Sequence, residues 1–294
     1  MSKNYNYLLR INAIKSLGGM GVYAVSVVPT LIRLSYDKDK VIKKETIRSL
    51  RNIIADESSP GEVGWLDDPK ARIWPKASVV PQKNKEKIDT HNRLLKEIIR
   101  VMIENSNDSD KEVRFQAIKG LNQFGNNSAN TLPVLIKMLE DKEPIIRRVT
   151  IQAIASYEDI DDEVISDLVS MLSDSSDQVI WASMNTLSKL GKRVVPELID
   201  VLEYDDPYLS PLILKVIYEL GKDAEASIFS IIRLLSSEDS EIRMLAAEAL
   251  GGIGIDNQEV KSKLKLSSKD NNLKVREAAR WALSRINKSK EVKF

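Results

Sequence analysis

Apolar residues return at a fixed interval along the chain. If one aliphatic residue is taken as position zero of a repeating unit, successive zeros are spaced by 33, 71, 33, 33, 30, 33 and 33 residues. These zeros are Leu9, Ile42, Val113, Ile146, Val179, Leu209, Ile242 and Val275. Positions plus eight and plus eleven are apolar in every unit, and position plus four is small in every unit except at Ile213. Residues at 0, 4, 8 and 11 share one helix face, so each unit predicts an amphipathic helix that a neighbour can approach closely.

Polar residues and glycines mark the ends of these helices. Three residues before each zero stand Asn6, Asp39, Asp110, Glu143, Ser176, Asp206, Asp239 and Asn272. All but Glu143 are good N-caps, because a short side-chain oxygen can accept a hydrogen bond from a free backbone N–H. Glycines at plus twelve, suited to a left-handed C-terminal cap, are Gly21, Gly125, Gly191, Gly221 and Gly254.

A second, shorter amphipathic helix is predicted before most of the long ones. The predicted segments are 29–34, 133–139, 165–172, 196–202, 228–235 and 260–266. Each helical hairpin would expose an apolar face that only its neighbours can bury, so the hairpins must stack. The pattern therefore predicts an all-α array of about eight hairpins, of which the first is incomplete.

Three segments carry a family resemblance: DSEIRMLAAEALGGIG at 239–254, DKEVRFQAIKGLNQFG at 110–125 and NLKVREAARWALSRI at 272–286. They resemble the HEAT-repeat family, in the short bacterial form also found in phycobilisome-lyase-type repeats. The resemblance implies a right-handed α–α superhelix, and it covers nearly the whole chain, so we expect a single solenoid over 1–294. It implies little about function, because such repeats occur in scaffolds, lyases and DNA-binding enzymes. The ankyrin and tetratricopeptide signatures do not fit these columns.

The spacing of 71 is one repeat plus 38 residues, and the surplus falls at about 55–90. This segment holds four prolines, which disfavour helix through most of it, together with Trp65 and Trp74. A loop of this length is usually functional or disordered. Trp65 and Trp74 either pack the insertion back onto the array or contact a partner, and plain disorder is the third alternative.

In HEAT solenoids the second helix of each hairpin lines the concave binding surface. With 0, 4, 8 and 11 buried, positions 2, 6 and 9 should face this groove, beginning with Ile11 and Lys15. The candidate partner-binding residues are Lys44, Arg48, Arg51, Phe115, Lys119, Arg148, Trp181, Lys215, Tyr218 and Trp281. Along the chain these residues change from mostly basic to mostly aromatic, and such a groove suits an extended peptide or an acidic helix of a partner. An ordinary solvated helix surface is the alternative interpretation.

The arginines at plus one have a different interpretation. Arg114, Arg147, Arg243 and Arg276 recur with the repeat and stand near the acidic N-caps. We expect them to form structural pairs between repeats, apart from any contact with a partner.

Composition narrows the functional classes. Charged residues are 30% of the chain and balance to +1, so no global excess favours nucleic acid or membranes. Residues 1–104 carry 19 Lys and Arg against 12 Asp and Glu, a net +7, whereas the remainder carries a net −6. The first seven residues lack the apolar core of a signal peptide, and no apolar run reaches ~18 residues. We therefore expect a cytoplasmic protein without a membrane span.

Candidate catalytic chemistry is sparse. The chain has no cysteine, and His91 is its one histidine. Zinc sites of several histidines, or a Ser-His-Asp triad with a supporting motif, cannot be built from this set. The glycines of LGGMG and LGGIG fit helix ends rather than phosphate loops. The sequence predicts no metal, no cofactor and no enzymatic activity.

The resulting hypothesis is a protein-interaction scaffold or adaptor that binds a protein or peptide in the groove. The first alternative is nucleic-acid binding through the basic N-terminal half of the groove. A further alternative, suggested by repeat resemblance alone, is a bilin-lyase-type chaperone.

Overall fold

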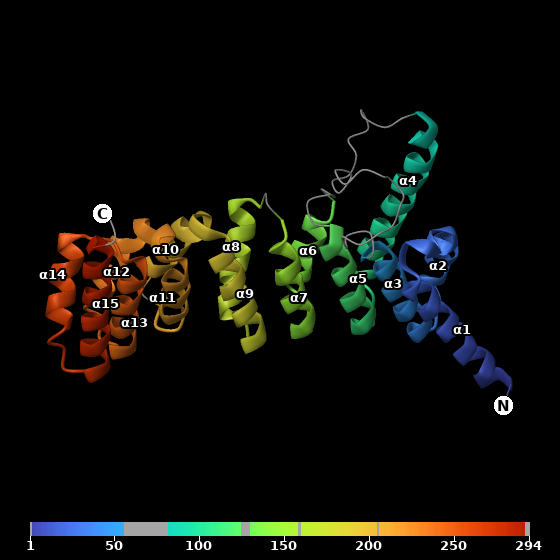
Figure 1. The fold of residues 1–294 in the computed structure, drawn as a ribbon. Coiled ribbons are helices and arrows are strands. Elements are labelled where there is room, and N and C mark those ends of the chain that lie inside the picture. Colours follow the sequence, from blue (N-terminus) through green and yellow to red (C-terminus); the bar gives the residue numbers. More distant parts are fainter. Residues whose placement is uncertain (1, 56–81, 125–129, 158–159, 205, 292–294) are drawn as a thin grey trace. The chain divides into compact units, whose positions relative to one another are not determined.

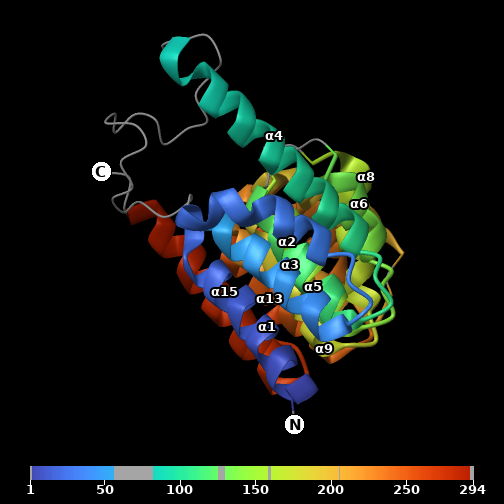
Figure 2. The same ribbon diagram turned by 90° about the vertical axis from the view of Figure 1, so that its right-hand side faces the viewer.

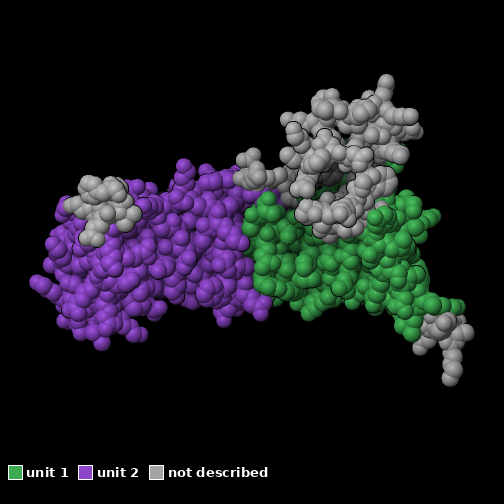
Figure 3. Space-filling model, in the orientation of Figure 1, with its two compact units in different colours: residues 1–156 green, residues 157–294 purple. Residues whose placement is uncertain are grey.

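The computed structural model describes residues 2–55, 82–124, 130–157, 160–204 and 206–291, and these form helices joined by turns (Figure 1). The chain divides into two compact units, residues 1–156 and 157–294 (Figure 3). Each unit is described by itself. The expectation of one solenoid over 1–294 stays a prediction.

Unit 1 is built from a row of helices formed by the repeat columns and a second set of helices packed beside them. The long helices are α1 (Ser2–Gly19), α3 (Lys40–Ala55), α5 (Lys111–Phe124) and α7 (Pro144–Ile154), and the others are α2 (Val28–Leu34), α4 (Gln82–Asn105) and α6 (Leu132–Met138). Helix α1 packs on α3, α3 on α5, and α5 on α7. Figure 2 shows α1, α3 and α5 running beside one another. A 3-10 helix, η1 (Gly21–Val27), joins α1 to α2.

Unit 2 repeats this plan. Its long helices are α9 (Asp177–Lys189), α11 (Leu209–Leu220), α13 (Ser240–Ile253) and α15 (Leu273–Glu291). The short helices are α8 (Asp162–Ser170), α10 (Val195–Glu203), α12 (Ile228–Leu234) and α14 (Gln258–Ser267), with 3-10 turns η4 (Met171–Ser173), η5 (Gly191–Val194) and η6 (Gly221–Ser227). Contacts run from α9 to α11, α13 and α15 in turn. The predicted hairpin repeat is confirmed in both units.

The apolar columns form the core in the internal repeats. At plus eight, Leu121, Leu187 and Leu250 are fully buried, and the small residues at plus four pack in the same seam. This inward seam is what the periodicity predicts.

The first repeat departs from the pattern. Leu9 and Met20 are each 49% exposed, whereas Ile11, which the periodicity directs into the groove, is buried together with Ile14. The prediction for Ile11 is wrong. Helix α1 contacts α3 and the 3-10 helix η1, while its side with Leu9 and Met20 stays exposed.

Most of the predicted caps are confirmed. The Asp39 carboxylate accepts hydrogen bonds from the backbone N–H groups of Val41 and Ile42 at 2.9 and 3.0 Å. Asp110, Asp206, Asp239 and Asn272 make equivalent bonds. The side chains of Glu143 and Ser176 make no capping bond, and Asn6 lies inside α1, so it is no cap. Positive φ angles of 53 to 67° occur at Gly21, Gly191, Gly221 and Gly254, while Gly125 lies outside the described residues.

The insertion is shorter than predicted. Helix α4 begins at Gln82, so the expectation of irregular chain to about residue 90 is wrong for 82–90. The last proline of the segment is Pro81, and beyond it Leu95, Ile98 and Met102 repeat at helical spacing and are buried. Trp65 and Trp74 lie outside the described residues.

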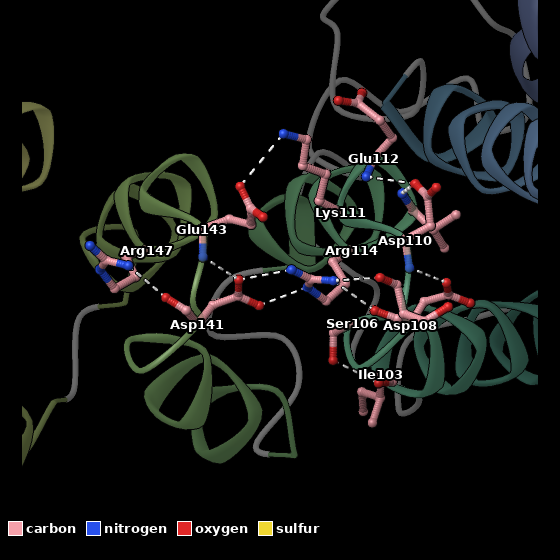
Figure 4. A network of polar contacts seen from close by, with 12 residues as sticks. Ile103, Ser106, Asp108, Asp110, Lys111, Glu112, Arg114, Asp141, Glu143 and Arg147 are labelled. Carbon is pink, nitrogen blue, oxygen red and sulfur yellow. Dashed lines mark hydrogen bonds and ion pairs between the residues drawn. The ribbon is translucent and has the colours of Figure 1, made fainter. Parts of the chain in front are cut away.

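Polar contacts join successive repeats along one edge of the array (Figure 4). In unit 1 the Arg114 guanidinium binds the Asp141 carboxylate through Nε and Nη2 at 2.7 and 2.9 Å, and Nη1 donates to the carbonyl of Asp108 at 2.8 Å. The side chains of Arg114 and Asp141 are 6% and 8% exposed. In unit 2 Arg243 binds Asp270 in the same two-pronged way. The predicted structural role is confirmed for Arg114 and Arg243.

The other basic residues at plus one complete the edge. Arg10 and Lys43 reach Asp37 and Asp108, each at 2.7 Å, so Lys43 spans the insertion and meets the repeat beyond it. Arg147 and Arg276 donate to the backbone carbonyls of Asp141 and Asp270. The hydrogen bond from Arg243 lowers the pKa of Asp270. Burial alone would raise the pKa of Asp108, but the Lys43 ammonium and a backbone N–H hold it below its usual value.

Candidate binding surface

The exposed sides of the long helices carry the predicted binding residues. We call Lys44, Arg48, Phe115, Lys119 and Arg148 the unit 1 face, and Trp181, Lys215, Tyr218, Glu248 and Trp281 the unit 2 face. The first comes from α3, α5 and α7, and the second from α9, α11, α13 and α15. None of these ten side chains is buried, which the core columns require of the opposite side of each helix.

The unit 1 face is positively charged and partly neutralised from within. Arg48 and Lys119 are exposed, and the Lys119 ammonium lies 5.5 Å from the centre of the Phe115 ring. The carboxylate of Glu45 is buried on α3, with Lys44 Nζ at 3.7 Å and Arg48 Nη1 at 3.9 Å. One negative charge therefore stands beneath several positive ones.

Arg51 is committed to contacts within the protein. Its Nη1 donates to Gln116 Oε1 at 2.6 Å, which links α3 to α5, and its Nη2 donates to Asn52 Oδ1 at 3.1 Å. Burial, followed by the nearby charge of Arg48, lowers the pKa of Arg51. Arg51 therefore stabilises the packing of α3 on α5, in addition to any contact with a partner. Lys15, the predicted groove residue of the first repeat, is exposed on α1.

The unit 2 face holds an aromatic pair that crosses a helix. Tyr218 on α11 and Trp281 on α15 have ring centres 6.0 Å apart at an interplanar angle of 36°. Helix α13 contacts both α11 and α15. A Cβ at Gly251 would lie 2.4 Å from the Trp281 ring, and one at Gly252 would lie 2.9 Å from Tyr218 Cδ2. Two side-chain-free positions on α13 therefore let the rings meet across it.

Sequence reasoning missed Gly251 and Gly252. The LGGIG segment predicts a helix cap, and Gly254 does serve as one in the left-handed conformation. The available signal was the pair of glycines inside the last helical turn. Glycine within a helix costs about 1 kcal/mol relative to alanine, so such a pair indicates a close contact that a larger side chain would block.

Charged side chains of both signs lie near the aromatic pair. The Arg285 guanidinium lies 5.3 Å from the centre of the Trp281 ring, within range of a cation–π contact. One turn before Gly252, burial raises the pKa of Glu248, against the opposing charge of Lys215. Trp181 on α9 is 62% exposed. The face combines large apolar rings with both signs of charge, which suits recognition of a polypeptide.

Within the described residues, no helix is both long enough and apolar enough to cross a membrane. The same part of the chain holds no group of three or more His, Asp or Glu residues placed to bind a metal ion.

The paired layers of short and long helices define an α-solenoid. The family model for HEAT repeats matches residues 92–155, 132–210 and 195–284, and the chain belongs to the HEAT-repeat family. No curated protein matches the chain.

Solved structures agree on the fold. A chain in the structure of Kap95p with RanGDP is 12% identical with a TM-score of 0.61, and the match covers 95% of this chain and 38% of that one. Importin beta is also 12% identical, with a TM-score of 0.60 and coverage of 89% and 35%. This chain spans little more than a third of the two natural solenoids.

Proposed function

We propose that the protein is a non-enzymatic scaffold or adaptor that binds a protein or peptide partner on the exposed faces of its long helices. The observation that carries this proposal is the aromatic content of the unit 2 face. Tryptophan and tyrosine at the centre of an interface each contribute about 2 kcal/mol or more to binding, and the Trp181 side chain is 62% exposed. A related fold appears with RanGDP in the Kap95p structure.

The two faces support different contacts. The unit 1 face offers Lys44, Arg48 and Lys119 to acidic side chains, since Glu45 neutralises one charge of several. The unit 2 face offers the rings of Trp181, Tyr218 and Trp281. A partner with an acidic segment and large apolar side chains could bind the basic unit 1 face with the first and the aromatic unit 2 face with the second.

Affinity capture from extracts of the source cells tests the proposal. Replacing both Trp181 and Trp281 by alanine should reduce recovery of the stoichiometric partner at least tenfold, because two anchors are removed. Phe229→Ala is the matched control, since Phe229 is 70% exposed on α12, a short helix of the other layer. Recovery unchanged in the double variant, or lost equally in the control, contradicts the proposal.

Nucleic-acid binding is the second candidate, and the basic unit 1 face is the observation that favours it. If it holds, Lys119→Glu should weaken binding of duplex DNA, and affinity should fall steeply with salt. Lys137→Glu on the short helix α6 is the control, because Lys137 is exposed on the other layer. No gel shift by the unmodified protein, even at low salt, excludes this candidate.

A further inference from the structure

The turn between α14 and α15 carries two leucines at places where the preceding repeats carry polar residues or proline. Leu266 stands nine residues before its repeat zero, and the six preceding repeats have Arg33, Glu104, Lys137, Ser170, Asp200 and Arg233 at this place. Leu273 stands two residues before the zero, where the same six repeats have Lys40, Lys111, Pro144, Asp177, Pro207 and Ser240. The side chains of Leu266 and Leu273 are 66% and 56% exposed.

Both places face water even in repeats that have neighbours on two sides. Asp200, at the place of Leu266, is exposed although α10 contacts both α8 and α12. Lys111, at the place of Leu273, is exposed although α5 contacts both α3 and α7. The exposure of the two leucines is therefore a property of the repeat, and it does not depend on what packs beside α14 and α15.

Lysines surround the two leucines. Lys269 lies in the turn and Lys274 lies in the first turn of α15, and both are exposed. Lys263 and Lys265 are exposed on α14, and Lys263 precedes Leu266 by three residues, on the same side of the helix. Among the described residues, none of these four ammonium groups has an ion-pair partner. We call Lys263, Lys265, Leu266, Lys269, Leu273 and Lys274 the turn patch.

The positive charge of the turn patch is local to this hairpin. Residues 157–257 carry 7 Lys and Arg against 21 Asp and Glu, a net −14, whereas residues 258–294 carry 11 against 4, a net +7. The balance of +1 over the whole chain hides this contrast. Asp270 is the one acid between residues 263 and 274, and its charge is already paired with Arg243 at 2.8 Å.

Hydrogen bonds fix the backbone that presents the turn patch. The Asp270 carboxylate accepts from the backbone N–H of Asn272 at 2.8 Å, and the Asn272 side chain accepts from the backbone N–H of Lys274 at 2.9 Å. Arg243 on α13 holds Asp270 through two further bonds. Because the turn is ordered in advance, little backbone entropy is lost when the patch binds.

The composition of the turn patch selects its partner. Lysine is depleted at protein interfaces, and leucine is under-represented among their hot spots, where Trp, Tyr and Arg dominate. Nucleic-acid phosphates attract lysines but offer nothing apolar to two leucines. An anionic lipid surface accepts both, because lysines attract the headgroups while leucines enter the boundary with the acyl chains. We propose that the turn patch binds the surface of a membrane that contains anionic phospholipids.

Co-sedimentation of the full-length protein with lipid vesicles tests the charge requirement. Binding to vesicles of phosphatidylserine and phosphatidylcholine in equal parts should exceed binding to pure phosphatidylcholine by about tenfold or more, since each lysine near an anionic surface adds about fivefold to the affinity. The Lys269→Gln, Lys274→Gln variant should lose about tenfold or more for the same reason. Its matched control is Lys192→Gln, Lys222→Gln, which changes net charge equally at two exposed lysines of segment 157–257 and should bind normally.

A fluorescent label tests whether Leu266 enters the lipid. The chain has no cysteine, so Leu266→Cys can carry a single NBD label, whose emission rises and shifts to the blue in an apolar environment. This change should appear on the anionic vesicles. A label at Phe229→Cys is the control and should not respond, since Phe229 is 70% exposed on α12, outside the turn patch. The Trp181→Ala, Trp281→Ala variant should bind vesicles normally, which separates this site from the proposed partner face.

Four results overturn the proposal. The first is no binding to either vesicle, or equal binding to both. The second is an NBD label at residue 266 that stays in water while the protein is bound. The third is a duplex DNA gel shift that Lys269→Gln, Lys274→Gln abolishes, because the partner would then be nucleic acid. The fourth is a concentration-dependent dimer that the same variant abolishes in sedimentation velocity, because the patch would then bind the acidic segment of a second copy.

Discussion

Replacing Asp141 by alanine should lower the free energy of unfolding by about 3 to 5 kcal/mol. The Asp141 carboxylate binds Arg114 through two hydrogen bonds and accepts a third from the backbone N–H of Glu143 (Figure 4). With both side chains nearly excluded from water, removal of the carboxylate leaves a buried guanidinium without its counter-charge. Breaking one half of such a pair costs far more than the pair contributes over an apolar replacement.

Asp37→Ala is the matched control for this effect. Asp37 makes the same turn bond, to the backbone N–H of Asp39 at 2.9 Å, and it pairs with Arg10. The Arg10 side chain is 48% exposed, so water can replace the lost partner and the ion pair contributes about 1 kcal/mol or less. Urea unfolding followed by circular dichroism compares the two variants. A loss at Asp141 that equals the loss at Asp37 contradicts the view that burial makes this contact important.

The second large effect is expected at the apolar seam. Leu121→Ala should cost about 2 to 5 kcal/mol, because Leu121 is fully buried and its removal leaves a cavity between α5 and its neighbours. Leu17→Ala, the same change at the same repeat position in α1, should cost less than half as much. Leu17 is only partly buried, and its surroundings can close over the gap or admit water.

The same unfolding measurement compares these two leucine variants. Equal losses at Leu17 and Leu121 would mean that the side of α1 that carries Leu17 is covered in solution as fully as the seam of α5.

The repeat and its register can be predicted from the sequence, because the residues that set the buried side and the ends of each long helix lie within that helix or next to it. The zeros, the small column and the Asp and Asn caps are local signals, and the structure places them as expected at Asp39 and Leu250. The structural role of Arg243 also follows from the recurring plus-one arginines, although its partner Asp270 lies two residues before the N-cap Asn272 rather than at the cap itself.

Features that depend on neighbours were less accessible. Ile11 is buried, although the same repeat position is half-buried or exposed in the other repeats. The contact of Tyr218 with Trp281 needs the glycine pair of an intervening helix, so no single repeat contains it. Arg51 is predicted as a partner contact, but its hydrogen bond to Gln116 arises only when two repeats stack.

The repeat register separates the buried seam from the proposed binding face, and the absence of cysteine allows a direct measurement of it. Ser183 and Asn185 lie on α9, with Ser183 at a seam position, fully buried, and Asn185 exposed on the binding side. In single-cysteine variants, Ser183→Cys should react with a maleimide only as the protein unfolds, whereas Asn185→Cys should react as fast as an unstructured thiol. Equal labelling rates in the folded protein, or the reverse order, would contradict both the architecture and the binding face.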